Sequence, residues 1–171
     1  KVIPVPEEVN WDEINNIGEE LYLTTKADWD NYENSFEFSI SPIIPQEDTI
    51  KEIKHGYSSF QNQWREATKK MMAQQENVNK VMIPLFGLQG EITPEILLSD
   101  ITLTANPYYR YDSKKNDEEL EALLLADTMK EFISYAVGCM LGRYSLDKPG
   151  LILANAGETQ EDYLRQVPEP T

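Results

Sequence analysis

The chain has 171 residues and carries 30 acidic against 15 basic side chains, which gives a net charge of −15. This length is enough for one domain with a buried core, whereas the acidic balance is opposite to that of a free-standing nucleic-acid-binding protein. No run of about 18 apolar residues is present that would span a bilayer, and the single cysteine, Cys139, excludes an intramolecular disulfide and is typical of a protein of the reducing cytoplasm.

The first region, residues 1–46, is predicted to begin as a Pro-spaced extended segment and to continue as a helix from about Trp11. Asn10 or Asp12 would cap this helix. A second short helix or turn is expected over 28–34, followed by an irregular crossing whose aromatic side chains enter the core, because two prolines interrupt any helix there. The first helix has one apolar stripe at helical spacing, formed by Ile14, Ile17, Leu21 and Tyr22.

Residues 47–85 carry a seven-residue repeat of apolar side chains. One series is Ile50, Tyr57, Trp64, Met71, Val78 and Leu85, and the other is Ile53, Phe60, Ala67, Gln74 and Val81. The repeat predicts one helix of about 35 residues, roughly 50 Å long at 1.5 Å per residue. Such a helix needs a partner for its apolar face. The partner is either the first or the central helix of the same chain, packed antiparallel, or a second copy of the chain.

A central helix is predicted over 116–148. Asn116 is a good N-cap, and Glu119 can complete a capping box with it. Pro149 and Gly150 would end the helix. Apolar residues recur every three or four positions and predict one wide buried face, made of Leu120, Leu123, Leu124, Met129, Phe132, Ile133, Ala136, Val137, Met140 and Leu141.

The regions on either side of the central helix are predicted to be largely irregular. Residues 86–115 should form a loop with a short strand from Ile101 to Ala105, and residues 149–171 a C-terminal tail. The five regions together predict one mainly α-helical domain, a long antiparallel helical hairpin or bundle with short irregular or β segments. Because the chain starts on Lys1 and not on Met, we expect it to be excised from a longer protein.

The motif Asn106-Pro107-Tyr108-Tyr109 points to chemistry. Methyltransferases that act on amino groups of bases use an Asn/Asp-Pro-Pro-aromatic loop, in which the polar side chain and a backbone carbonyl bind the exocyclic amine and the aromatic ring stacks on the flipped base. This sequence lacks the second proline, a Gly-rich turn after a strand and a downstream acid. The favoured interpretation is a Pro-containing loop whose tyrosines pack or line a surface.

The remaining candidates are also interpreted structurally. His55 has no metal-ligand spacing around it, Cys139 is expected to be a small buried side chain, and Gly138 and Gly142 should let a neighbouring helix approach closely. We expect no catalytic, cofactor-binding or metal-ligating residue in this chain. Five basic residues are expected to gather near one end of the central helix, where they could contact a phosphate backbone: Arg110, Lys114, Lys115, Arg143 and Lys148.

Two phrases, ITLTANPYYRY at 101–111 and EELEALLLADTMKEFISYAVGCMLGRYSLDKPGL at 118–151, resemble the bacterial adenine-specific DNA methyltransferases of the PglX type. These enzymes belong to phage-defence (BREX) systems and are similar to single-chain type II restriction-modification enzymes. The phrases DWDNYENSFEF at 28–38 and FGLQGEITPE at 86–95 resemble the same family in the same order. The resemblance therefore covers most of residues 28–151.

The resemblance implies a helical region behind the methyltransferase core, which connects the catalytic domain to the target-recognition part. The parent enzyme would bind S-adenosylmethionine, flip adenine and methylate its N6 amine. In this family the catalytic Asn-Pro-Pro-Tyr loop and the Gly-rich cofactor motif lie in a separate domain, so no catalytic residue is carried over to this chain. The implied partners are DNA, through the parent enzyme, and other domains of the same polypeptide, with a monomer or weak dimer as the expected state.

Two other functions remain open at this point. The acidic front and the heptad repeat could belong to an acidic helical protein-interaction module or a coiled-coil dimer. A self-contained enzyme is the third interpretation, which measurable binding of S-adenosylmethionine to this chain would revive.

Overall fold

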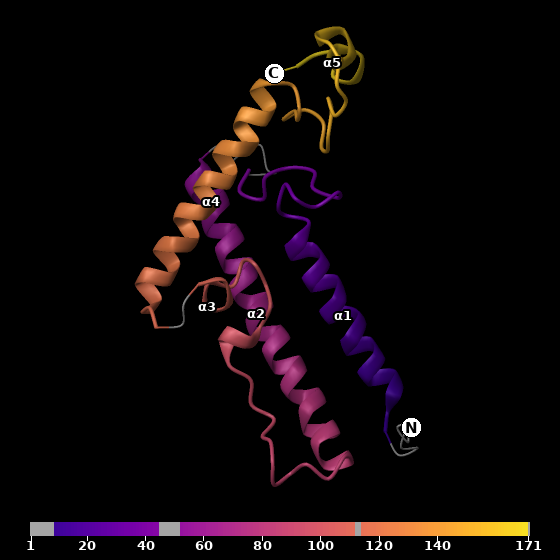
Figure 1. Ribbon diagram of the computed structural model, residues 1–171, viewed down its shortest axis with the longest axis vertical. Coiled ribbons are helices and arrows are strands. Elements are labelled where there is room, and N and C mark those ends of the chain that lie inside the picture. Colours follow the sequence, from indigo (N-terminus) through magenta and orange to yellow (C-terminus); the bar gives the residue numbers. More distant parts are fainter. Residues whose placement is uncertain (1–8, 45–51, 112–113, 171) are drawn as a thin grey trace.

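The computed structural model describes residues 9–44, 52–111 and 114–170. They form the α-helices and one 3-10 helix of Figure 1, in the order α1 (Trp11–Trp29), α2 (Ile53–Leu85), η1 (Leu98–Asp100), α3 (Pro107–Arg110), α4 (Asp117–Met140) and α5 (Gln160–Gln166). The mainly α-helical prediction is confirmed. None of the described residues forms a β-strand, and none of their helices is long and apolar enough to cross a membrane.

The predicted strand from Ile101 to Ala105 is wrong. The segment makes consecutive turns, in which the Leu103 N–H donates to the Ile101 carbonyl at 2.9 Å and the Asn106 N–H donates to the Leu103 carbonyl at 3.0 Å. β-branched residues favour a strand only when a neighbouring strand can pair with it. Here the backbone groups are satisfied locally and by side chains of other elements.

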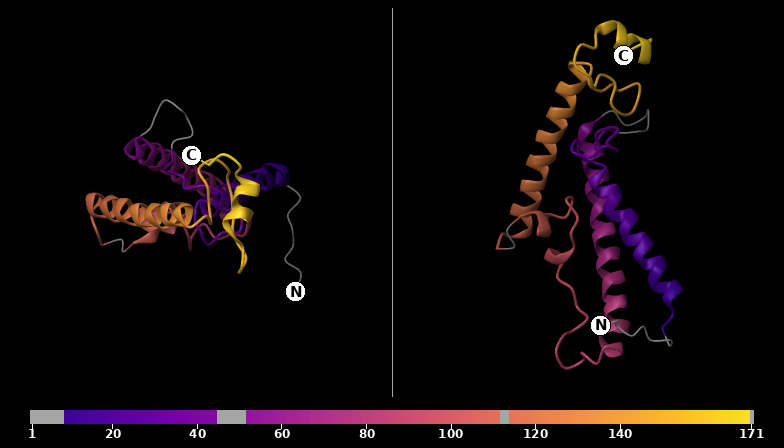
Figure 2. Two further views of the ribbon diagram at one scale, coloured as in Figure 1. Left: turned by 90° about the horizontal axis from the view of Figure 1, so that it is seen from above. Right: turned by 45° about the vertical axis from the view of Figure 1, so that its right-hand side comes forward.

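α1 and α2 lie side by side in opposite directions and form the long axis of the molecule (Figures 1 and 2). Glu20 of α1 accepts hydrogen bonds from Gln74 at 2.6 Å and from Lys70 at 2.7 Å, both on α2. Leu21 packs against the buried residues of α2. The predicted antiparallel helical hairpin is therefore confirmed, with α1 as a partner of the long helix; the first residues of that predicted helix, 47–51, lie outside the described part of the chain.

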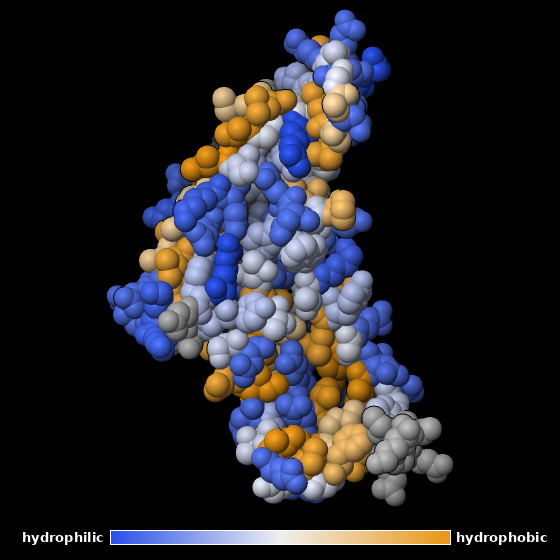
Figure 3. All heavy atoms as spheres, in the orientation of Figure 1, coloured by the Kyte–Doolittle hydropathy of each residue, from blue (hydrophilic) through white to orange (hydrophobic). Residues whose placement is uncertain are grey.

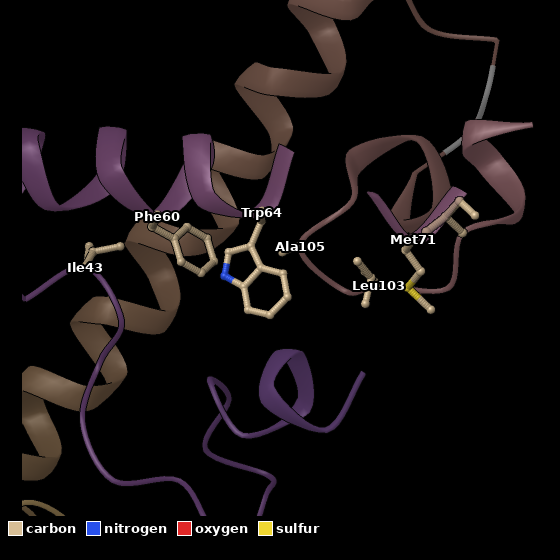
Figure 4. Packing of buried hydrophobic residues seen from close by; sticks show 7 residues of the cluster. Ile43, Phe60, Trp64, Met71, Leu103 and Ala105 are labelled. Atoms are coloured by element: carbon tan, nitrogen blue, oxygen red, sulfur yellow. The ribbon is translucent and has the colours of Figure 1, made fainter. Parts of the chain in front are cut away.

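The main core lies along the heptad face of α2. Phe60, Trp64 and Met71 are buried there, and Figure 4 shows them beside Leu103 and Ala105 of the segment that follows η1. The same cluster includes Ile43, from the irregular segment after α1, and Ile101. The heptad repeat thus identified the buried side of α2, but an irregular segment covers much of it in place of a second long helix.

α4 does not pack along α2 in the way the sequence predicts. Figure 2 shows the segment of η1 and α3 between the two long helices, and this segment touches both of them. Direct contact is local: Glu121 of α4 binds Arg65 of α2 at 3.0 Å and also accepts from Gln61, while Met129 and Phe132 pack against the core. The segment of η1 and α3 therefore holds α4 against the hairpin.

The predicted start of the central helix is correct and its predicted end is not. Asn116 and Glu119 form the reciprocal capping box at the start of α4. The helix ends at Met140, eight residues before the predicted residue 148, because Gly142 adopts φ +78°, a backbone conformation that glycine favours.

The expectation that Gly138 and Gly142 admit a neighbouring helix holds only for Gly142, where an added Cβ would lie 3.3 Å from the ring of Tyr163 in α5. Gly138 leaves room for the ring of Tyr144, which would lie 2.6 Å from an added Cβ. The chain reverses there, and Tyr144 joins Phe38 and Tyr135 in a second, aromatic core cluster. The following residues contain α5, although the sequence predicts only a largely irregular C-terminal tail over 149–171.

Candidate functional site

A pocket of about 370 Å³ is lined by α4, by Arg110 of α3 and by residues 29–42, at and after the end of α1. Its wall includes aromatic rings, among them Tyr32 and Tyr135, and a few polar groups, of which Arg110 and Glu131 carry charge. Concave sites with apolar walls and a small number of placed polar groups are the usual setting of ligand sites. The chemistry of this pocket therefore depends on how its charged groups are already engaged.

Arg110 occupies the last position of α3 and is the centre of a network that we call the Arg110 cluster: Tyr32, Arg110, Tyr111, Asp127 and Glu131. The Arg110 guanidinium donates to Glu131 at 2.8 Å and lies 3.7 Å from Asp127. It lies 5.8 Å from the ring centre of Tyr32 and 5.7 Å from that of Tyr111, and the Tyr111 hydroxyl donates to Asp127 at 2.8 Å. The contacts to Asp127 and Glu131 join the end of α3 to α4, and the contact to Tyr32 joins it to the segment after α1.

The protonation behaviour of the cluster agrees with a structural ion-pair network. Burial raises the pKa of Glu131, and the hydrogen bond from Arg110 opposes that rise. Burial likewise raises the pKa of Tyr32 and Tyr111, so both phenols keep their protons at neutral pH. A hydrogen bond from Lys130 lowers the pKa of Asp127, with a further contribution from Tyr111. Two acidic side chains thus compensate the one arginine.

Asp28 provides a second connection between distant segments. It lies in the last turn of α1, is 2% exposed, and accepts hydrogen bonds from the backbone N–H of Thr104 at 2.6 Å and of Ala105 at 3.0 Å. Burial raises its pKa, while these hydrogen bonds act in the opposite direction. The carboxylate satisfies two backbone donors that a strand would otherwise have paired, and so fixes α1 to the segment that leads into α3.

Two polar atoms near the pocket are buried without a hydrogen-bond partner in the described part of the chain: Arg110 Nη1 and Glu33 Oε1. The other Glu33 oxygen accepts from Ser134 of α4 at 2.8 Å. Both residues line the pocket beside aromatic side chains. A lining of this kind is suited to binding and positioning a group.

The Asn106-Pro107-Tyr108-Tyr109 motif is structural. The Asn106 side chain is 1% exposed; its amide nitrogen donates to the carbonyls of Leu98 at 2.7 Å and Ile101 at 2.8 Å, and its oxygen accepts from the Tyr108 N–H at 3.2 Å. Asn106 thereby caps α3, and Pro107 occupies the first helical position. Both the nitrogen and the oxygen of the amide are engaged within the chain, which agrees with the interpretation of this motif as a packed loop.

The five basic residues proposed to contact a phosphate backbone are not gathered. Lys114 and Lys115 precede α4, whereas Arg143 and Lys148 follow its end, and the 24-residue helix between them is about 36 Å long. Arg143 lies over the Tyr144 ring at 5.5 Å, and Lys148 donates to Gln166 at 3.0 Å. Since Arg110 is paired with two carboxylates, no shared basic surface results; contact of any of these residues with DNA stays a prediction.

The other sequence candidates have ordinary positions. His55 lies in the first turn of α2 with an exposed side chain near Glu52. Cys139 is partly buried on α4, and burial raises the pKa of its thiol, which keeps it protonated and unreactive. Across the described ranges no cluster of three or more His, Cys, Asp or Glu side chains is arranged to hold a metal ion.

Asp28 and Glu131 are important residues that the sequence reasoning missed. A signal for Asp28 was present, because it stands seven residues after Leu21 and fourteen after Ile14 on the apolar stripe of the first helix. A carboxylate on an apolar stripe is buried, and a buried carboxylate must find hydrogen-bond donors. Its donors, however, come from a segment 76 residues further along the chain, and no local pattern identifies them.

Comparison with known proteins gives two relatives and no matching family model. Over 133 residues the chain is 35% identical to the adenine-specific methyltransferase BrxX of Escherichia coli O9:H4 (strain HS). The matched region covers 78% of this chain and 11% of the relative. Over 153 residues the chain is 27% identical to the adenine-specific methyltransferase PglX of Lacticaseibacillus casei (strain Zhang). The matched region covers 88% of this chain and again 11% of the relative. The chain thus spans about a ninth of each relative, and the resemblance inferred from the sequence is confirmed.

Proposed function

We propose that this chain, which is related over most of its length to one segment of the adenine-specific methyltransferases BrxX and PglX, is a helical connector of an adenine-N6-specific DNA methyltransferase. In that role it holds the catalytic domain and the target-recognition domain at a fixed separation around DNA, within a phage-defence or restriction-modification system. The connector itself is not catalytic. The small share of each relative that the chain matches, 11%, is the observation that carries this proposal.

The elongated arrangement of the helices supports the connector role. α1 begins at the end of the molecule where α2 finishes, and α5 lies at the opposite end, beyond the end of α4 (Figure 1). α2 alone is about 50 Å long. The Asp28 hydrogen bonds join α1 to the segment before α3, and the Arg110 cluster joins α3 to α4.

S-adenosylmethionine is the methyl donor that the parent enzyme would use, and the described residues do not fit it. Its usual site follows a β-strand with a Gly-rich turn at the start of a helix. Here the glycines with positive φ, Gly87, Gly142, Gly150 and Gly157, lie in turns that no strand precedes. The parent's cofactor site is therefore proposed to lie in another part of the polypeptide.

An insertion experiment in the complete polypeptide tests the connector role. Six Gly and Ser residues inserted after Gly157, in the exposed turn before α5, would uncouple whatever follows from α4. The assay measures methyl transfer from labelled S-adenosylmethionine to genomic DNA of a strain that lacks the enzyme. We expect the rate of this transfer to fall about tenfold or more, with unchanged cofactor affinity.

The same insertion after Gly90 is the matched control. Gly90 lies in the turn between α2 and η1, with no atom within 4 Å of an added Cβ, and lengthening this turn leaves the two ends of the molecule where they are. We expect this variant to methylate normally. Equal rates for the two insertions, or measurable binding of S-adenosylmethionine to the 171-residue chain, would contradict the proposal.

A further inference from the structure

The outward side of α4 exposes a row of large apolar side chains. Leu125 is 42% exposed, Ile133 60%, Val137 46% and Met140 85%. We call these four residues the α4 stripe. Figure 3 shows hydrophobic side chains following the upper left edge of the molecule, where α4 lies in Figure 1. Contiguous apolar surface of this kind on a folded protein usually marks an interaction site.

The opposite side of α4 is apolar as well and is already covered. Leu120, Leu124, Tyr135 and Gly138 are buried against the rest of the chain. A helix of a folded protein normally covers each of its broad apolar faces. α2 differs, since its outward side carries charged residues such as Glu66 and Lys69, which pair with each other. On α4, by contrast, the outward side needs a second partner.

The dimensions and charges of the stripe indicate what covers it. From Leu125 to Met140 the stripe runs 15 residues, or about 22 Å, which matches one helix of about four turns. Acidic side chains of Glu118 and Glu119 are exposed about two turns before its first residue, Leu125. A nucleic acid is a poor occupant, because an apolar surface with an acidic end cannot neutralise phosphates. An amphipathic helix with basic residues beside Glu118 is complementary to this surface.

We propose that the α4 stripe is covered by an amphipathic helix from another part of the same polypeptide, with basic side chains next to the acidic start of α4. This inference rests on the proposed function. The relatives are about nine times longer than the segment that they share with this chain. A helix tethered in the same polypeptide has a high effective concentration, whereas a second copy would pay the full cost of association.

Cysteine labelling in the complete polypeptide tests this interaction. In a Cys139→Ala background, without other reactive thiols, Ile133→Cys reports on the α4 stripe, Glu66→Cys on a solvent-exposed position of α2, and Leu124→Cys on the buried side of α4. We expect a maleimide to modify Ile133→Cys at the slow rate of Leu124→Cys, at least tenfold below the rate of Glu66→Cys. Adding Glu118→Lys should raise the Ile133→Cys rate severalfold.

The outcomes that overturn the proposal are distinct. An Ile133→Cys rate equal to that of Glu66→Cys means that no helix covers the stripe. Protection that disappears on dilution, together with a dimer in sedimentation, assigns the surface to a second copy. If Glu118→Lys leaves the labelling rate of Ile133→Cys unchanged, the covering helix has no basic side chains next to Glu118. Methylation is not scored here, so this experiment and the insertion experiment on the connector can fail independently.

Discussion

Replacing Asp28 with Asn tests whether one buried carboxylate joins α1 to the segment before α3. The two carboxylate oxygens accept from Thr104 and Ala105, whereas the amide has one oxygen and would turn its NH₂ group towards the other backbone donor. A buried donor without an acceptor costs about 1–3 kcal/mol. For a chain of this size each kcal/mol lowers Tm by about 2–4 °C, so we expect Tm to fall by about 2–12 °C.

The pH dependence of this variant gives a second and sharper result. Burial raises the pKa of Asp28 above its ordinary value of 3.8, so the folded state holds a proton there more tightly than the unfolded chain. The associated stability is fully present below pH 3.8 and is lost as the pH rises through the folded-state pKa. The difference in unfolding free energy between the wild type and Asp28→Asn should therefore widen as the pH is lowered from 7 towards 4.

Urea unfolding followed by circular dichroism at several pH values measures the loss of stability in Asp28→Asn and the pH dependence of that loss. Asp100→Asn is the matched control, because Asp100 is exposed and its replacement should leave stability within about 0.5 kcal/mol of the wild type. A Tm for Asp28→Asn equal to that of this control would refute the structural role of Asp28. A free-energy difference that narrows on acidification would show that the backbone hydrogen bonds, and not burial, dominate the pKa.

Two further predictions concern helix stability, and thermal unfolding measures each. Gly56→Ala should lower Tm markedly, because an added Cβ would lie 1.8 Å from the carbonyl oxygen of Ile43. Gly18→Ala is the control: it lies in open space on α1 and should stabilise the protein by about 0.5–1 kcal/mol. Equal effects of the two substitutions would contradict the packing at Gly56. Asn116→Ala should cost about 1 kcal/mol, since it removes the capping box with Glu119, and an unchanged Tm would show that the cap contributes nothing.

The features predicted correctly from the sequence are those governed by neighbouring residues. Asn10 caps α1 and Asn116 caps α4, because cap side chains bind N–H groups two or three residues away. The heptad positions Phe60, Trp64 and Met71 are the buried side of α2, since helical geometry places them on one face whatever covers them.

The incorrect predictions involve contacts that helical periodicity does not describe, whether the partner is distant in sequence or follows a reversal of the chain. The 101–105 segment has the composition of a strand, but its N–H groups bind Asp28 and local carbonyls. Gly138 looks like a helix-contact glycine, although the side chain packed on it is Tyr144. The apolar residues of α4 were assigned to one buried face, yet Ile133 and Met140 are exposed.

The sequence by itself determined that this protein is mainly helical, where α1 and α4 begin and which side of α2 is buried. It also carried the resemblance to the PglX-type methyltransferases. Only the tertiary structure decided that α1 covers α2, that α3 separates α4 from the hairpin, that Arg110 is paired with carboxylates, and that one side of α4 remains open. The physical reason is that caps and periodicity act over one or two turns of chain, whereas the choice of packing partner depends on which distant surfaces complement each other.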